Sequence, residues 1–379
     1  MNRLYCLLFL MMVVAACRKA YNPPAIANKN NYLVIEGQIN TGNDSTIITL
    51  SRTVQLSAKS TVNPELGATV TVEDDQNNSY PLTEQGIGQY ASPDLGISAG
   101  AKQCRLRVKT VNGKTYLSDF AEIKVSPPID TVGFTVQTNG VLIYLSTHDV
   151  TNKSRYYRWD YRSTWIFHSY YDSYYKLVDG FPVYRFASED VYYCWAHDTS
   201  STIVLNSSAK LAQDVINQTT LAFLPSTSEK LEDRYSILVK QYAITPQAFD
   251  YFTILKKNTE QLGTVFDAQP SQLLSNIKCI SDPAEPAIGY ITAGTVTQKR
   301  IYIDSRLLPA WKPYTFYEQY GCPMDEVVIG SPDERAYYFG GNPPNYLPLT
   351  APNVASERIC VDCTLRGTKT EPIFWKIDE

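Results

Sequence analysis

Apolar and polar residues alternate along many short segments of this chain, which is the pattern of β-strands with one buried face. The clearest segment is 103–109, where Cys104, Leu106 and Val108 alternate with Gln, Arg and Lys residues. Further β-rich runs lie at 32–39, 47–51, 68–73, 115–118 and 121–125. Gly, Asn and Asp residues separate these runs, as turns separate the strands of an antiparallel sheet. We therefore predict a small antiparallel β-sandwich over residues 31–127.

A second β-rich domain is predicted over residues 128–379, and it contains a concentration of aromatic residues. Between positions 156 and 195, 16 of 40 residues are aromatic, whereas the whole chain is 12% aromatic. Tyr157 and Trp159 alternate with charged residues, so we expect them in the core. The total of 28 tyrosines also favours β structure, because Tyr is preferred on half-buried strands.

The segment 170–175 shows no such alternation and is predicted to be an exposed loop. Tyrosines give large, rigid contacts and keep a polar tip, which suits them to recognition surfaces. The alternative is ordinary packing of these rings. We predict a binding surface for a small ligand or a peptide formed by Tyr170, Tyr171, Tyr174 and Tyr175.

One amphipathic helix is predicted at about 246–262. Thr245 is a suitable N-cap, Pro246 suits the first helical position, and Gly263 can end the helix. Phe249, Phe252, Leu255 and Leu262 would form its apolar face. Strands are expected at 235–242, around 289–293 and at 299–303. The many prolines after residue 307 exclude long regular elements from the tail.

The amino-terminal segment has the pattern of a secretory signal. Arg3 precedes an apolar run at 4–14, which is shorter than the roughly 20 residues that a membrane-spanning helix needs. The following Val14-Ala15-Ala16-Cys17 resembles a bacterial lipobox, so we predict a signal peptide at 1–16 and lipidation of Cys17. An ordinary signal peptide that is cleaved nearby is the alternative. Two or three acyl chains would hold the protein firmly on a membrane.

Residues 17–30 are polar and are predicted to be a flexible tether between the lipid and the first domain. The whole chain has 34 Lys and Arg residues against 38 Asp and Glu residues. Removal of residues 1–16 takes away only Arg3, which leaves the mature chain slightly more acidic. This balance excludes the basic face that a nucleic-acid partner would require.

Six of the eight cysteines remain once Cys6 is removed with the signal peptide and Cys17 is acylated. Disulfides are allowed in an oxidising compartment, and six cysteines permit 15 pairings. We expect Cys360 and Cys363 to have a structural role, with a bridge from this pair to Cys322. Redox or metal chemistry is the alternative, although no second cysteine pair and no βαβ context accompany the motif. Cys104 is expected to point inward as a small hydrophobic residue.

No catalytic, cofactor or metal site is predicted. Gly96-Ile97-Ser98-Ala99-Gly100 fits the nucleophile-elbow pattern but precedes a strand and not a helix. The run 86–91 lacks the strand and helix of a dinucleotide site, and the acidic run 73–78 lacks the glycine and glutamate of an EF-hand. The histidines His148, His168 and His197 have neither metal nor triad spacing, and His197-Asp198 is the best pair.

These residues together resemble a family of uncharacterised lipoproteins from Bacteroidota, known as domain of unknown function 4249. The matching segments are 33–37, 48–53, 67–70, 128–130, 157–159, 231–242, 266–271, 289–291, 360–363 and 372–375. They cover nearly the whole mature chain. Cys104 departs from the family pattern, in which we expect a tyrosine.

The resemblance implies an exported lipoprotein of the outer membrane that accompanies a TonB-dependent outer-membrane transporter. It also implies that the first domain is similar to an immunoglobulin-like sandwich, and it supplies no catalytic residues. We therefore predict a non-catalytic accessory or ligand-binding partner of such a transporter, anchored by lipid on the periplasmic or the surface-exposed side. The alternatives are an architectural or adhesive envelope lipoprotein and a hydrolase with an unrecognised site.

Overall fold

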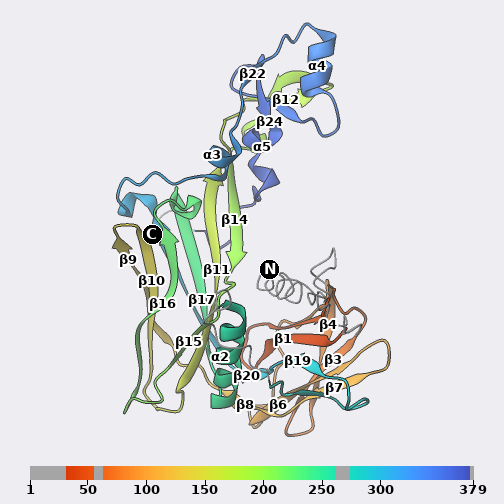
Figure 1. The fold of residues 1–379 in the computed structure, drawn as a ribbon, viewed down its shortest axis with the longest axis vertical. Helices are drawn as coiled ribbons and strands as arrows, with labels where there is room; N and C mark the ends of the chain where they lie inside the picture. Colours follow the sequence, from red (N-terminus) through yellow and green to blue (C-terminus); the bar gives the residue numbers. More distant parts are fainter. Residues whose placement is uncertain (1–30, 55–62, 261–273, 376–379) are drawn as a thin grey trace, which may run out of the picture.

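The computed structural model describes residues 31–54, 63–260 and 274–375. The fold is mainly β, as predicted, and it divides into three parts (Figure 1). These parts are a closed sheet, a two-sheet sandwich and a smaller lobe at the opposite end from the closed sheet. Cys17 and the segments predicted to be a signal peptide and a tether lie outside the described residues. No helix in the described residues has the length and apolar character needed to cross a membrane.

The closed sheet contains the predicted strands of the first domain together with three strands from much later in the chain. Its strands are β1 (Leu33–Asn40), β2 (Thr46–Arg52), β3 (Thr69–Asp74), β4 (Ser79–Gly86), β5 (Gln89–Ser92), β6 (Gln103–Lys109), β7 (Thr115–Ser118), β8 (Ala121–Lys124), β18 (Ile277–Cys279), β19 (Ala287–Gly289) and β20 (Thr292–Gly294). Eight of them pair in the order β6-β3-β4-β5-β2-β1-β20-β8, and β8 pairs again with β6. The ring of pairings is therefore complete.

The return of residues 277–294 differs from the predicted division of the chain, which assigned these residues to the second domain. β20 pairs in parallel with β1, with Gln38 opposite Thr292, and also with β8. Without β20, the edges of β1 and β8 would lack this partner, and unpaired backbone groups at buried edges are costly. The more specific prediction, that the first domain is similar to an immunoglobulin-like sandwich, remains a prediction.

The sandwich packs a three-stranded sheet against a five-stranded sheet. The first sheet contains β9 (Ile129–Gln137), β10 (Gly140–Asp149) and β16 (Asp214–Pro225), and the second contains β11 (Tyr156–His168), β14 (Tyr193–Thr199), β15 (Val204–Ser207), β17 (Arg234–Ala243) and β21 (Val296–Asp304). Tyr157 and Trp159 are fully buried between the sheets, as predicted. The Trp159 indole N–H donates to Oε1 of Gln241 at 2.9 Å, which satisfies both polar groups in the core.

The predicted helix is α2 (Pro246–Glu260), and it lies against the five-stranded sheet at the end nearer the closed sheet (Figure 1). The Thr245 hydroxyl accepts from the Ala248 N–H at 3.2 Å, in agreement with the predicted N-cap. The buried residues of α2 are Ala248, Tyr251 and Phe252. The buried face is therefore rotated from the predicted one, because Phe249 and Leu255 are only partly buried and Leu262 lies outside the described residues.

The third part, which we call the distal lobe, consists of residues 169–192 and 314–365. It contains short elements: β12 (Tyr175–Val178), β13 (Phe181–Tyr184), η1 (Ala187–Glu189), α3 (Phe316–Tyr320), β22 (Asp325–Glu326), α4 (Pro332–Phe339), β23 (Tyr346–Pro348), β24 (Val354–Glu357), α5 (Arg358–Val361) and η4 (Cys363–Leu365). The short turns η2 (Glu229–Leu231) and η3 (Ser305–Leu307) belong to the sandwich. In the described part of the proline-rich tail, 308–375, the longest element is α4 with 8 residues, in agreement with the prediction.

Candidate functional site: the distal lobe

The four predicted binding tyrosines differ in their exposure. Tyr170 and Tyr174 are 45% and 51% exposed, whereas Tyr175 is only 9% exposed and contacts the ring of Tyr184 at 4.5 Å. Tyr171 is half-buried, and its hydroxyl donates to the Cys322 carbonyl at 3.2 Å. A surface made of all four rings is therefore corrected to two exposed tyrosines, because the other two rings pack within the lobe.

Backbone and hydroxyl contacts explain why this segment is not a free loop. The Tyr171 N–H donates to the Cys360 carbonyl at 3.0 Å, and the Tyr174 N–H donates to the Leu349 carbonyl at 3.2 Å. Between them, the buried Ser173 hydroxyl donates to the Pro348 carbonyl at 2.6 Å. The absence of alternation in the sequence predicted a loop, but it carried no information about these partners, which lie some 180 residues later.

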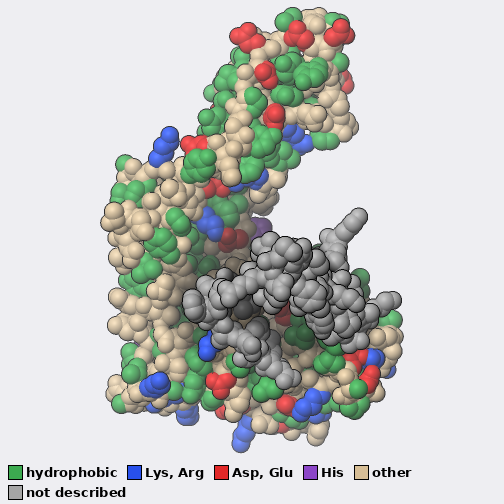
Figure 2. All heavy atoms as spheres, in the orientation of Figure 1, with side chains coloured by type: hydrophobic (Ala, Val, Ile, Leu, Met, Phe, Trp, Pro, Cys, Tyr) green, Lys and Arg blue, Asp and Glu red, His purple; other side chains and the backbone are tan. Residues whose placement is uncertain are grey.

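The more exposed apolar surface belongs to the β12–β13 hairpin, which the sequence analysis missed. Side chains on one face of this hairpin are Val178, Phe181 and Val183, which are 45%, 47% and 43% exposed. The neighbouring Tyr184 and Phe186 are 67% and 72% exposed. Tyr184 is paired with Tyr175 and lies on the opposite face of the hairpin. Phe186 lies beside Lys176, on the face of Phe181. We call Val178, Phe181, Val183 and Phe186 the hairpin surface. Figure 2 shows hydrophobic side chains over much of the distal lobe, with acidic side chains at its far end.

A local signal for this hairpin exists in the sequence. Asp179 and Gly180 connect the two strands, and both have positive φ values, of 52° and 77°. This backbone matches the type I′ turn, for which Asp-Gly is a preferred pair. An Asp-Gly pair between two short apolar runs therefore predicts the hairpin, although it does not predict which face is exposed.

Two disulfides hold the distal lobe together and attach it to the sandwich. Cys322 is bonded to Cys360, as the predicted bridge requires, with a Cα–Cα distance of 5.8 Å. Cys363 is bonded to Cys194 of β14, and this partner was not predicted. The two cysteines of the Cys-Val-Asp-Cys motif thus belong to different disulfides. This arrangement gives the motif a structural role.

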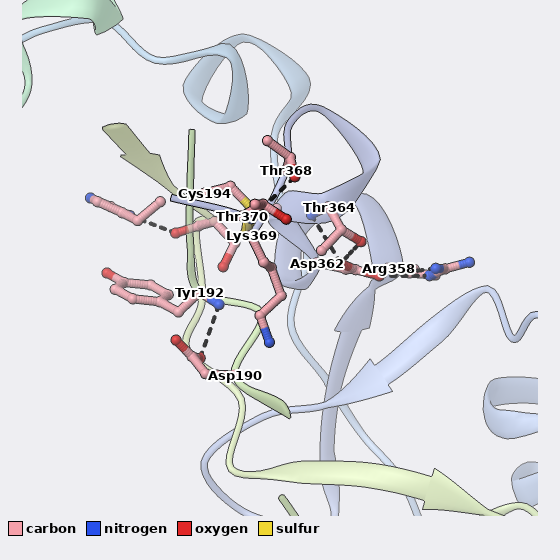
Figure 3. Close-up of a disulfide and its surroundings, with 12 residues drawn as sticks. Asp190, Tyr192, Cys194, Arg358, Asp362, Thr364, Thr368, Lys369 and Thr370 are labelled. Atoms are coloured by element: carbon pink, nitrogen blue, oxygen red, sulfur yellow. Dashed lines mark hydrogen bonds and ion pairs between the residues drawn. A yellow bond between two sulfur atoms is a disulfide. The ribbon is translucent and has the colours of Figure 1, made fainter. Parts of the chain in front are cut away.

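The surroundings of the Cys194–Cys363 disulfide add polar contacts to the covalent bond (Figure 3). Asp362 is 5% exposed, accepts from the Arg358 guanidinium at 3.0 Å and accepts from the Thr364 N–H at 3.0 Å. Trp195 and Thr368 exchange two backbone hydrogen bonds of 2.8 and 2.9 Å. Together these contacts fix the orientation of the lobe on β14.

Arg366 makes a second contact between this region and the sandwich. Its guanidinium donates to both carboxylate oxygens of Glu229, at 2.9 and 2.7 Å, and also lies over the ring of Phe167 at 4.9 Å. A bidentate arginine–carboxylate pair fixes geometry as well as charge. The Glu229 pair is one cause that raises the pKa of Arg366, in opposition to burial.

Two of the three histidines lie beside carboxylates. Nδ1 of His148 lies 2.8 Å from Asp130, and Nε2 of His168 lies 3.2 Å from Glu232. Hydrogen bonds to these carboxylates raise the pKa of both histidines. Among the described residues, no serine or cysteine side chain is hydrogen-bonded to a histidine, and no cluster of three His, Cys, Asp or Glu residues could hold a metal ion. Asp198 pairs with Lys230 instead of with the adjacent His197.

The remaining two cysteines lie in the core of the closed sheet. Cys104 and Cys279 are free thiols that are 0% and 3% exposed. Burial raises the pKa of the Cys104 thiol to about 12. The inward orientation predicted for Cys104 is confirmed, and its raised pKa disfavours the reactive thiolate.

Comparison with known proteins identifies the family. No curated protein matches the chain. The family model DUF4249, a domain of unknown function, matches residues 18–300, a segment that ends within β21 and includes the β12–β13 hairpin. The predicted resemblance extended to residue 375, beyond the end of this match. Because the matched segment covers well over half of the sequence, the chain belongs to the DUF4249 family.

Proposed function

We propose that this protein is a non-catalytic binding protein of the bacterial outer membrane that contacts a protein partner through its hairpin surface. The observation that carries the proposal is the group of exposed apolar side chains on a lobe held by two disulfides. A lipid on Cys17 would anchor the protein. The partner that the family resemblance implies is a TonB-dependent outer-membrane transporter.

The composition of the hairpin surface supports protein recognition. Phe181 and Phe186 offer large side chains with few rotatable bonds, so that little conformational entropy is lost when they are buried. Exposed groups of this kind frequently mark interaction sites in soluble domains. The Arg335 guanidinium lies over the Phe181 ring at 4.2 Å and restricts its motion. The surface is therefore prepared for contact before a partner arrives.

The position of the lobe favours a protein partner over a lipid surface. The first described strand, β1, lies in the closed sheet, at the end of the molecule opposite to the lobe (Figure 1). An anchor at Cys17 would therefore hold the closed-sheet end near the membrane. The exposed Asp179 and Asp333 near the hairpin and in α4 would also repel anionic lipid headgroups.

The test uses the full-length protein with Phe181→Ser and Phe186→Ser together. We expect at least a tenfold loss of the TonB-dependent transporter that co-purifies with the protein, because two central apolar contacts are removed. The matched control is Val111→Ser with Val150→Ser, which removes apolar side chains that are 75% and 80% exposed outside the lobe. The thermal midpoint should stay the same in both variants.

Unchanged recovery of the transporter with the hairpin variant would exclude this surface. If the wild-type protein recovers no outer-membrane transporter under conditions in which it is correctly lipidated, the proposed partner is wrong. Equal losses in the hairpin variant and the control variant would likewise count against the proposal, because they would indicate a general effect on solubility.

A further inference from the structure

A cleft lies between the closed sheet and the outer face of the five-stranded sheet, remote from the hairpin surface. It has a volume of about 540 Å³. Asp44 and Ile47 line it from the closed sheet, and Arg162, Leu238 and Lys240 line it from the sandwich. This volume is within the usual range of small-molecule sites.

The floor of the cleft is organised in rows across three neighbouring strands. Arg162 of β11 is paired in register with Leu238 of β17, and Leu238 is paired with Arg300 of β21. Side chains in such a row point to the same face of the sheet. The two arginines therefore flank Leu238, about 10 Å apart at two strand spacings.

The two acidic side chains that line the cleft each form an ion pair with a lysine or an arginine. Asp44 pairs with Lys240 at 3.1 Å, which joins the closed sheet to the sandwich, and Asp160 pairs with Arg158 at 3.1 Å. In the part of the chain that the structure describes, Arg162 is exposed and its guanidinium has neither an ion pair nor a hydrogen bond. No ion pair joins Arg300 to another described residue either. Arg162 and Arg300 are therefore two positive charges without an acidic partner.

The groups in direct contact with the Arg300 guanidinium are neutral. Its guanidinium donates to the Ser236 hydroxyl at 2.9 Å and lies over the Phe374 ring, 3.5 Å from the ring centroid. Burial lowers the pKa of Arg300, and the nearby Arg162 lowers it further. Like charges in one row of a sheet repel, and an anion bound to Arg162 would reduce this repulsion.

A hydroxyl group adds a neutral donor to the same cleft. Ser200 lines the cleft, and its Oγ accepts from the Tyr161 N–H at 3.1 Å. No acceptor for the Ser200 O–H is present among the described residues, so this proton is free to point at a ligand. Ile47, which is 49% exposed, and Leu238 provide apolar walls.

We propose that this cleft binds a small organic anion, with a carboxylate or phosphate group on Arg162 and a compact apolar part against Leu238 and Ile47. The planar guanidinium of arginine binds either group through two parallel hydrogen bonds. The Asp44–Lys240 pair closes the cleft at the junction between the two parts. This site is independent of the hairpin surface and of the proposed transporter partner.

The test titrates the full-length protein with benzoate, phenyl phosphate and the neutral analogue benzamide, and measures binding by calorimetry. We expect benzoate or phenyl phosphate to bind at least tenfold more tightly than benzamide, because only the anions carry a negative charge that pairs with the Arg162 guanidinium. Arg162→Gln should weaken anion binding at least tenfold. Arg162→Lys should weaken it less, since it keeps the charge but loses the bidentate geometry.

The matched control is Lys102→Gln, which removes one exposed positive charge from the closed sheet outside the cleft. It should bind the anions within twofold of the wild-type protein. The Phe181→Ser and Phe186→Ser variant should also bind them normally, which separates this test from that of the proposed function. Absence of anion binding below about 10 mM, or equal binding by wild type and Arg162→Gln, would overturn the proposal.

Discussion

The closed sheet and the distal lobe reach a stable structure in different ways. The closed sheet has one continuous apolar core, in which Leu33, Ile35 and Leu50 are at most 1% exposed. It contains no disulfide among its described residues, and its two thiols stay reduced inside the core. The distal lobe has several small clusters instead, and both disulfides have cysteines within it.

This difference shows how the lobe can expose apolar side chains without losing its fold. Small units bury too little apolar surface to be stable by burial alone, and covalent links commonly supply the remaining stability. Because the disulfides constrain the lobe, Phe181 and Phe186 are not required in its core. Their exposure is therefore compatible with binding, whereas Leu33, Ile35 and Leu50 of the closed sheet are buried in its core.

The largest expected effect is the destabilisation caused by the loss of a disulfide, which should differ between the two regions. Replacing Cys194 and Cys363 by alanine should destabilise the distal lobe by about 2–5 kcal/mol and leave the closed sheet unaffected. Replacing Cys322 and Cys360 should have an effect about 1 kcal/mol smaller, since those cysteines are 38 residues apart and not 169. Amide hydrogen exchange, resolved by segment, measures both changes. Equal acceleration of exchange in lobe and closed sheet would contradict the comparison.

A substitution in the core of the closed sheet should destabilise the closed sheet and leave the distal lobe unaffected. Leu50→Ala should destabilise the closed sheet by about 3 kcal/mol, because it leaves a cavity beside fully buried neighbours. Labelling of Cys104 and Cys279 by a thiol reagent should then become about 100-fold faster at equilibrium, since the opened state is more populated. Val111→Ala, at an exposed position, is the control. Unchanged labelling in Leu50→Ala would show that the thiols react without opening of this core.

The smallest expected effect concerns the junction between the lobe and the sandwich. The hydrogen bond to Glu232 raises the pKa of His168, against the opposing effect of burial, and Asp233 adds a second nearby negative charge. A raised pKa in the folded state means that the stabilisation is complete below the ordinary histidine pKa and is lost as the pH rises through the raised value.

We therefore expect the lobe to lose about 0.5 kcal/mol between pH 6 and pH 9, roughly the contribution of a partly exposed ion pair. Hydrogen exchange of the segment 169–175, corrected for the intrinsic effect of pH, measures this loss. His168→Gln should abolish the dependence, and His148→Gln, which removes a histidine of the sandwich, should retain it. The same pH dependence in both variants would exclude His168 as its source.

Local patterns predicted much of the fold. Alternation placed Cys104 and Trp159 in the core, and the cap at Thr245 placed the start of α2 correctly. The prediction was less successful for the candidate site, because it treated the four tyrosines of the segment 170–175 alike. Tertiary contacts decide which rings are exposed, because Tyr175 packs on Tyr184 and the Tyr171 hydroxyl donates to the Cys322 carbonyl.

The sequence by itself determined the mainly β class, the position of the helix and the inward faces of individual strands, because burial repeats with the local period of each element. The tertiary structure decided which distant segments meet. It paired Gln38 with Thr292, bonded Cys194 to Cys363 and aligned Arg162 with Arg300 across β17. These contacts join residues far apart in the chain, and a periodic pattern reports whether a side chain is buried but not which residue covers it.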